Sequence, residues 1–181
     1  MTSSKTSYDA PRTNDPARTM SDIIAVATQE FADKGLSGAR IDEIAALTQT
    51  SKRMIYYYYG SKEGLYLAVL EDAYARTRSA ESGLHLDDIE PVEALKKLVS
   101  FSIDYKLAHP EFVRLVMTEN IHSAEYLKRS KTAVHMNTPA IDLLQRIYER
   151  GVASGDFRSG IEAFDLHMAI SALSLYNVSN R

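Results

Sequence analysis

Two basic and two phenolic side chains recur at helical spacing near position 55 of this 181-residue sequence. Lys52 lies four residues before Tyr56, and Arg53 lies four residues before Tyr57, so a helix here would place all four on one face. Lysine and arginine donate hydrogen bonds to phosphates and guanine edges, and tyrosine hydroxyls bond backbone oxygens. This face therefore predicts contact with the major groove of DNA.

The local charge supports this interpretation. The chain carries a formal net charge of −3, but residues 48–62 contain three cations, Lys52, Arg53 and Lys62, and no Asp or Glu. Cations without neighbouring carboxylates are typical of surfaces that face phosphates.

Each of these residues also has an ordinary alternative. Lys52 and Arg53 could lie on a solvated helix face, and Tyr56 and Tyr57 could be packing residues. Three neighbours are expected in the core or at its rim: Ile55, Tyr58 and Tyr59.

Other chemistries find little support. With no Cys there is no disulfide framework or thiolate site, which suits a cytoplasmic protein. No GxGxxG, GxxxxGK[ST] or GxSxG motif occurs, and no apolar run is long enough to span a membrane. His109, His122 and His135 stand 13 residues apart without an HxxxH pair, which favours helix caps or pocket residues over a metal site. We therefore predict no enzymatic activity, metal or cofactor.

The elements that must position the basic face are helices. Apolar residues recur at spacings of three and four, and the chain has only 8 Gly and 5 Pro. The aperiodic residues 1–16 are expected to form a flexible arm, and Asp15-Pro16 predicts the first helix start. Gly35 is expected to end that helix with a positive φ.

A helix of about two turns follows around 41–47, and a polar break at Thr48-Gln49-Thr50 separates it from the helix that carries the basic face. Ser51 is the expected N-cap of that helix, and Gly60-Ser61 opens a longer one. A short helix, a tight turn and a second helix form a helix-turn-helix unit. Later helices are expected to open at Pro91, Pro110 and Pro139, the last of these stopping at Gly151.

The segment IIAVATQEFADKGLSGARIDEIAALTQTSKRMIYYYYGSKEGLYLAVLEDAY resembles the N-terminal DNA-binding domain of TetR-type transcriptional regulators. The features that match are Phe31 and Gly35 at the end of the first stripe, Ile44-Ala45, Ser51, Ile55-Tyr56-Tyr57, and Ser61-Lys62-Glu63 with Leu65. The turn departs from the family's usual Ala-Gly-Val, because Thr48-Gln49-Thr50 has no glycine. A left-handed non-glycine residue there costs roughly 1 kcal/mol.

The resemblance implies an all-α, ligand-responsive regulator that binds a palindromic operator as a homodimer. It further implies a repressor released by a small apolar or aromatic effector. The implied domains are the helix-turn-helix domain at 17–62, a connecting helix to about 80, and a helical effector-binding and dimerisation domain at 81–181. The alternative is a helical carrier or enzyme that does not bind DNA.

The resemblance also assigns residues to sites. The DNA contacts it implies are Arg40, Ser51, Lys52, Arg53, Tyr56, Tyr57 and Lys62. Two helices, at about 139–150 and 162–178, would pair the subunits through Leu143, Ile147, Ile170 and Leu173.

A pocket is expected among the C-terminal helices, with plain core as the alternative for any one residue. Its proposed ligand contacts are Tyr105, Met117, Asn120, His122 and His167. Further apolar lining is expected from Phe112, Met136, Tyr148, Phe164 and Met168.

Overall fold

The computed structural model describes residues 15–130 and 137–180, and every regular element within them is a helix. The α-helices are α1 (Pro16–Gly38), α2 (Ile41–Leu47), α3 (Lys52–Tyr59), α4 (Lys62–Ser82), α5 (Pro91–Ala108), α6 (Pro110–Ile121), α7 (Thr138–Ser154) and α8 (Ala163–Ser179). Two 3₁₀ turns, η1 (Leu86–Asp88) and η2 (Leu127–Arg129), lie between them. The predicted all-α fold is confirmed.

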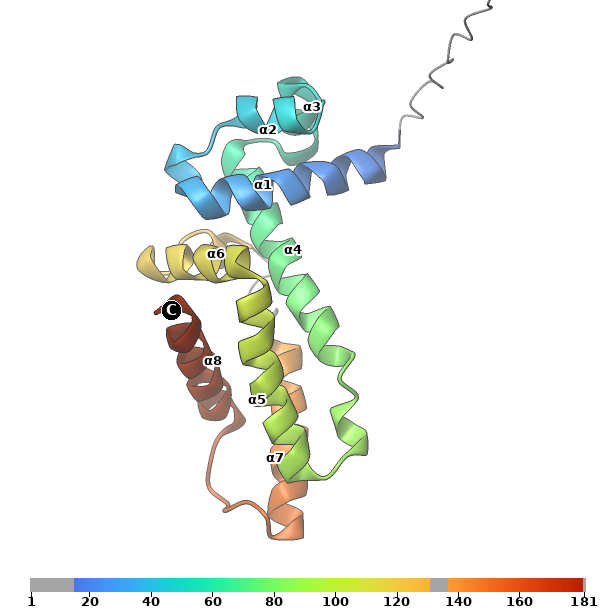
Figure 1. Cartoon of the computed structure of the whole chain (residues 1–181), viewed down its shortest axis with the longest axis vertical. Helices are drawn as coiled ribbons and strands as arrows, with labels where there is room; N and C mark the ends of the chain where they lie inside the picture. The colour runs from blue at the N-terminus through green and yellow to red at the C-terminus, as the bar shows by residue number, and fades with distance from the viewer. Residues whose placement is uncertain (1–14, 131–136, 181) are drawn as a thin grey trace, which may run out of the picture.

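The long helix α4 connects the two ends of the molecule (Figure 1). α1 crosses the upper part of α4, and α2 and α3 lie above it. α6 runs beneath α1, while α5, α7 and α8 lie along the lower half of the molecule. The helix that carries the basic face therefore lies at the far end from α7 and α8.

The start and end of the first helices follow the predicted local signals. The Asp15 carboxylate accepts hydrogen bonds from the backbone N–H of Ala17 at 3.0 Å and of Arg18 at 3.2 Å. Gly35 has a φ of +65°, and the chain turns there toward α2. In the following turn Gln49 takes the left-handed conformation, with a φ of +52°, at the position where the sequence lacks glycine.

Two clusters of buried apolar side chains hold the fold together. One includes Phe31 of α1, Ile55 of α3 and Tyr66 of α4, and it also takes in Leu115 and Val116 of α6. The other joins residues of η1, α5 and α7. The α6 helix therefore packs with the helix-turn-helix unit, although it lies beyond the boundary expected near residue 81.

The α7 helix corrects one predicted boundary. It continues through Gly151 to Ser154 and ends at Gly155, whose φ is +85°. Gly151 is buried because the ring of Phe157 lies where a side chain would stand. The glycine thus serves a close contact inside the helix instead of ending it.

Candidate nucleic-acid interface

The turn between α2 and α3 is built from backbone and hydroxyl hydrogen bonds. The Thr48 hydroxyl donates to the Ile44 carbonyl at 2.7 Å, and the Thr50 N–H donates to the Ala45 carbonyl at 3.1 Å. The Ser51 hydroxyl accepts from the Met54 N–H at 3.2 Å, which confirms Ser51 as the N-cap of α3. These bonds set the angle between the two helices.

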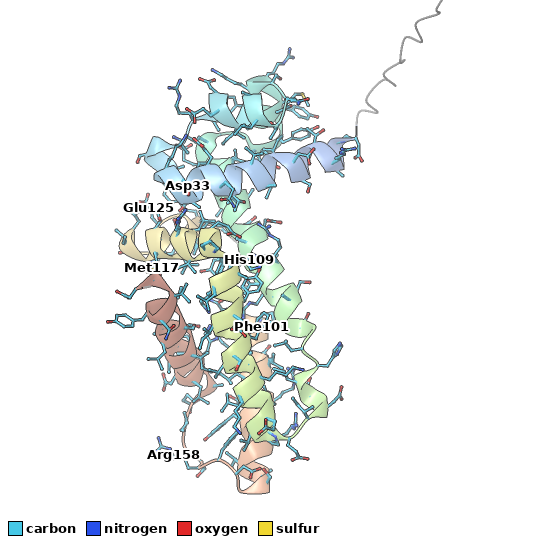
Figure 2. The ribbon with its side chains drawn as sticks, in the orientation of Figure 1. Asp33, Phe101, His109, Met117, Glu125 and Arg158 are labelled. Carbon is cyan, nitrogen blue, oxygen red and sulfur yellow. The ribbon has the colours of Figure 1, made fainter. Side chains whose placement is uncertain are left out.

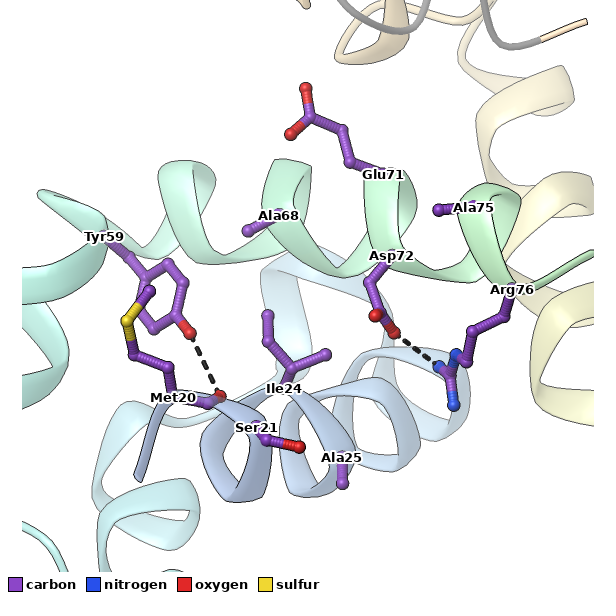
Figure 3. Close-up of a pocket in the computed structure, with 10 residues that line it drawn as sticks. All are labelled: Met20, Ser21, Ile24, Ala25, Tyr59, Ala68, Glu71, Asp72, Ala75 and Arg76. Carbon is purple, nitrogen blue, oxygen red and sulfur yellow. Dashed lines mark hydrogen bonds and ion pairs between the residues drawn. The ribbon is translucent and has the colours of Figure 1, made fainter. Parts of the chain in front are cut away.

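The inner face of α3 is anchored by two residues. Ile55 is fully buried in the N-terminal core. The Tyr59 hydroxyl donates to the Met20 carbonyl of α1 at 3.1 Å (Figure 3). Burial, followed by the charge of Asp72, raises the pKa of Tyr59 above its ordinary value, so the phenol stays a donor.

The opposite face of α3 is turned to the outside. Lys52 and Arg53 are exposed, and the side chains of Tyr56 and Tyr57 are 44% and 77% exposed. The structure therefore brings together on one open face the four residues that the spacing predicted. Arg53 forms no ion pair within residues 15–130 and 137–180, so its guanidinium remains available.

Two carboxylates of α2 modify the charge beside this face. Asp42 pairs with the Lys52 ammonium, and the Arg40 guanidinium lies 3.7 Å from Asp42 and 3.9 Å from Glu43. The prediction of cations without neighbouring acids is therefore corrected. Residues 48–62 contain no acid, but the turn between the two helices brings Asp42 of α2 against Lys52 at the start of α3.

The remaining two predicted contacts have structural roles as well. Arg40 is the N-cap residue of α2 and makes no capping bond with its own side chain. The Lys62 ammonium, half-buried at the start of α4, donates to the Ser37 carbonyl at 3.2 Å. Both cations lie on the same end of the molecule as α3.

Glu30 is a residue of this region that sequence reasoning missed. Its buried carboxylate accepts from the Arg40 N–H at 3.1 Å and lies 3.0 Å from the Lys34 ammonium. Glu30 of α1 therefore caps the N-terminus of α2, a role that the Arg40 side chain does not fill. The contact joins residues ten apart, across the turn at Gly35, so no local pattern indicates it.

A groove of about 550 Å³ separates α1 from α4 next to this surface. Figure 3 shows Ile24 and Ala68 facing each other across it, with the Tyr59 bond to Met20 near one end. An ion pair of 2.8 Å between Asp72 and Arg76 lies toward the other end.

The predicted effector residues do not gather around one cavity. Tyr105 packs its ring against His109, with centroids 4.2 Å apart, and His122 ends α6 beside the N-terminal helices. Met117 and Asn120 lie on the exposed side of α6. His167, on α8, is half-buried, and this burial lowers the pKa of its imidazole. Met117, Asn120 and His122 therefore do not share a cavity with Tyr105 and His167, because α6 turns its inner face toward α1, and their role as ligand contacts stays a prediction.

Two further predicted lining residues, Phe164 and Met168, are also exposed, on the outer side of α8. Phe112 and Tyr148 are buried. Met136 and His135 lie outside the described residues.

The predicted dimer residues divide between core and surface. Ile147 is fully buried in the C-terminal core of its own chain, which corrects its assignment to a subunit interface. Leu143 and Ile170 are half-buried against the same core. Leu173 is 71% exposed on α8.

An all-α molecule with an exposed basic helix in a helix-turn-helix unit has the architecture of a DNA-binding regulator. Residues 23–69 match the family described as "Bacterial regulatory proteins, tetR family". Residues 91–181 match the description "Tetracyclin repressor-like, C-terminal domain". The chain belongs to the TetR family of transcriptional regulators.

Individual relatives agree with this assignment. The chain is 40% identical over 164 residues to the HTH-type transcriptional repressor NicS of Pseudomonas putida, covering 91% of this chain and 77% of that protein. The fatty acid degradation regulator FadR of Bacillus halodurans superposes with a TM-score of 0.74 at 19% identity, over 93% of this chain and 85% of that one. The FadR of Bacillus subtilis, solved in complex with stearoyl-CoA, gives a TM-score of 0.68 at 16% identity, over 88% and 87%. These two likenesses show the fold.

Within residues 15–130 and 137–180, no helix has both the length and the apolar character needed to cross a membrane.

Proposed function

We propose that this chain is an effector-controlled repressor that binds a palindromic operator as a homodimer, with α3 in the major groove. The observation that carries the proposal is the outward face of α3, where Arg53 is unpaired among the described residues and two phenols stand beside it. Arg53 would read a guanine edge, and Tyr56, Tyr57 and Lys62 would bind the flanking phosphates. The name of the relative NicS as a repressor supports the direction of control.

The α8 helix supports the homodimer. Met168, Leu173 and Tyr176 are exposed, and Ala169 and Ala172 between them are exposed too. Positions three and four apart lie on one side of a helix, so these residues form an apolar stripe. Such a stripe on the surface is typical of a protein–protein contact, and a two-fold axis would bury it against its own copy.

Contacts of α6 provide a route from the C-terminal helices to α3. The Arg114 guanidinium of α6 pairs with Asp33 of α1, and both helices are seen side by side in Figure 2, where Asp33 is labelled. The Tyr66 hydroxyl of α4 donates to the Glu119 carboxylate of α6 at 3.0 Å. Glu119 is 1% exposed and also accepts from the Leu127 N–H at 3.2 Å. Movement of α6 or α4 would therefore shift the helix-turn-helix unit.

The effector would act by favouring a dimer shape whose two α3 helices no longer fit successive major grooves. To weaken DNA binding a hundredfold, it must bind the two shapes with affinities that differ by about 2.7 kcal/mol. We further propose that the chain acts in the cytoplasm, where such an operator is accessible, and that it catalyses no reaction.

A mobility-shift assay over a salt series tests the proposal. Arg53→Ala should lower affinity for a palindromic promoter fragment by roughly 1–3 kcal/mol and relax the preference at one base position. Lys62→Ala should weaken binding to all sequences and reduce the salt slope by about 1. Arg158→Ala, an exposed arginine between α7 and α8 (Figure 2), is the matched control and should bind as the unaltered protein does. Equal affinity of all these proteins for palindromic and scrambled DNA would refute the proposal.

A further inference from the structure

Arg40 lies on the surface beside the start of α3. Its side chain is 65% exposed, and its guanidinium lies 3.7 Å from the carboxylate of Asp42, which itself pairs with Lys52 of α3. Arg40 and Lys52 therefore lie beside the same carboxylate. In helix-turn-helix proteins the first helix of the unit crosses the DNA backbone, and Arg40 stands at the start of this helix, α2.

Glu30 of α1 holds the backbone from which the Arg40 side chain extends. Its buried carboxylate accepts from the Arg40 N–H at 3.1 Å, and among the described residues the Arg40 side chain makes no capping bond of its own. An N–H that loses its acceptor in a partly buried place is costly, so this bond fixes the backbone at Arg40 against α1. Because Glu30 supplies the acceptor, the guanidinium is left for other partners.

Lys34 of α1 engages the second carboxylate near Arg40. Its ammonium lies 3.0 Å from the carboxylate of Glu30 and donates to that of Glu43. Arg40 Nε, in contrast, lies 3.9 Å from the Glu43 carboxylate, which is beyond hydrogen-bonding distance. Glu43 is thus held by Lys34 and competes only weakly for the Arg40 guanidinium.

We propose that Glu30 and Lys34 are positioning residues that present Arg40 to a DNA phosphate, which rests on the proposed function as a DNA-binding repressor. Glu30 fixes the backbone of Arg40, and Lys34 keeps Glu43 from binding its guanidinium. Neither residue contacts DNA in this role. Two residues of α1 would then set the affinity for DNA through the side chain of Arg40.

This role reverses the effect that charge alone would have. Glu30 is negatively charged, so removing its charge would strengthen the attraction for DNA if only long-range electrostatics acted. Positioning predicts the opposite change, because the loss of the acceptor allows Arg40 to move away from its phosphate. The sign of the change in affinity therefore distinguishes the two effects.

Two variants of equal charge isolate the hydrogen bond. Glu30→Gln and Glu30→Met both remove the carboxylate and are close to it in size, but only Gln keeps an oxygen that can accept from the Arg40 N–H. In an anisotropy titration with the palindromic promoter fragment at about 0.1 M salt, Glu30→Met should bind about five- to tenfold more weakly, and Glu30→Gln should stay within about twofold of the unaltered protein. Asp22→Asn, which removes an exposed carboxylate from the same helix, controls for charge and should not weaken binding.

The salt dependence supplies a readout that a loss of stability would not change. Each phosphate contact contributes about 0.9 to the slope of log affinity against log salt concentration. Glu30→Met and Arg40→Ala should each reduce this slope by about that amount, and the double variant should reduce it no further. A smaller folded fraction would lower the affinity equally at every salt concentration and leave the slope unchanged.

Lys34→Met tests the same role should Glu30→Met fail to fold, because Lys34 is 43% exposed and its replacement leaves the core intact. It should lower both the affinity and the salt slope in the unaltered background, since Glu43 is then released to Arg40. In the Arg40→Ala background it should change neither. An equal effect in both backgrounds would mean that Lys34 acts on DNA by itself, which contradicts the proposal.

The outcomes separate this role from the function it rests on. Equal losses in Glu30→Gln and Glu30→Met, an affinity of Glu30→Met as high as that of Asp22→Asn, an unchanged salt slope, or additive losses in the double variant would each overturn the positioning role. The regulator would survive these results as long as the unaltered protein binds the palindrome specifically. An unaltered protein that does not prefer palindromic over scrambled DNA would refute the regulator and this role together.

Discussion

At the level of single residues, Lys52 and Arg53 are neighbours in the chain but differ in their electrostatic surroundings. Asp42 pairs with Lys52 from α2, while Arg53 has no acidic partner within the described part of the chain. A phosphate that approaches Lys52 must displace Asp42, whereas Arg53 needs to release only water. Arg53 is therefore the better candidate for base recognition, and Asp42 limits how strongly α3 attracts DNA.

The substitution Asp42→Asn tests this competition. Exposed ion pairs contribute up to about 1 kcal/mol, so the freed Lys52 should raise affinity for any DNA by roughly two- to fivefold and steepen the salt slope. Fluorescence anisotropy with specific and scrambled duplexes measures both quantities. Asp88→Asn removes the same charge at η1, far from α3, and should leave binding unchanged. Unaltered affinity in Asp42→Asn would show that the pair does not oppose DNA binding.

At the level of elements, the orientation of α3 depends on its corner with α4. The Ser61 hydroxyl caps α4 by accepting from the Gly64 N–H at 3.0 Å. A Cβ atom on Gly64 would lie 2.1 Å from the Tyr59 carbonyl oxygen, so the end of α3 approaches α4 as closely as backbone permits. Only glycine fits there, because the obstacle is a backbone atom that cannot move alone.

Replacing this glycine should open the corner. We expect Gly64→Ala to lower the free energy of unfolding by roughly 1–3 kcal/mol, as overpacking does, and to weaken DNA binding by misplacing α3. Thermal unfolding and the mobility-shift assay measure the two effects. Gly83→Ala is the matched control at the other end of α4, where the added Cβ meets the Ala80 carbonyl oxygen at 3.4 Å, an ordinary contact. A Gly64→Ala protein as stable as Gly83→Ala would contradict this packing argument.

At the level of the whole molecule, the two functional ends are joined by α4 and by the contact of α6 with α1. The N-terminal core includes Leu115 and Val116 of α6, so the helix-turn-helix unit is not packed independently of the C-terminal helices. The α8 helix, which lies at the end of the molecule away from α3 (Figure 1), carries the exposed apolar residues proposed to pair two copies. The distance between the two α3 helices of a dimer sets the spacing of the operator half-sites. This distance would then depend on the α8 contact between the copies and on the contact of α6 with α1 in each copy.

A charge placed in the α8 stripe should separate the subunits. Leu173→Glu is expected to shift the protein toward monomer, because a carboxylate cannot be buried against its own copy without a partner. Sedimentation at a series of concentrations measures the shift, and affinity for the full palindrome should fall with it. Ile121→Glu, at a position 75% exposed on α6, should leave the assembly unchanged. If Leu173→Glu remains a dimer, the subunits pair through another surface.

The sequence by itself determined the helices and the outward face of α3. Proline starts, the Asp15, Ser51 and Ser61 caps, and apolar spacing act within a few residues, so their effects can be predicted locally. The left-handed conformation of Gln49 could also be predicted locally, because the tight turn requires one such residue and Thr48-Gln49-Thr50 contains no glycine.

Only the tertiary structure decided which residues meet across helices. The pairing of Lys52 with Asp42, the capping of α2 by Glu30, and the burial of Ile147 all depend on how separate elements are oriented. The predicted effector residues scattered because helical spacing defines a face but not the helix that it packs against.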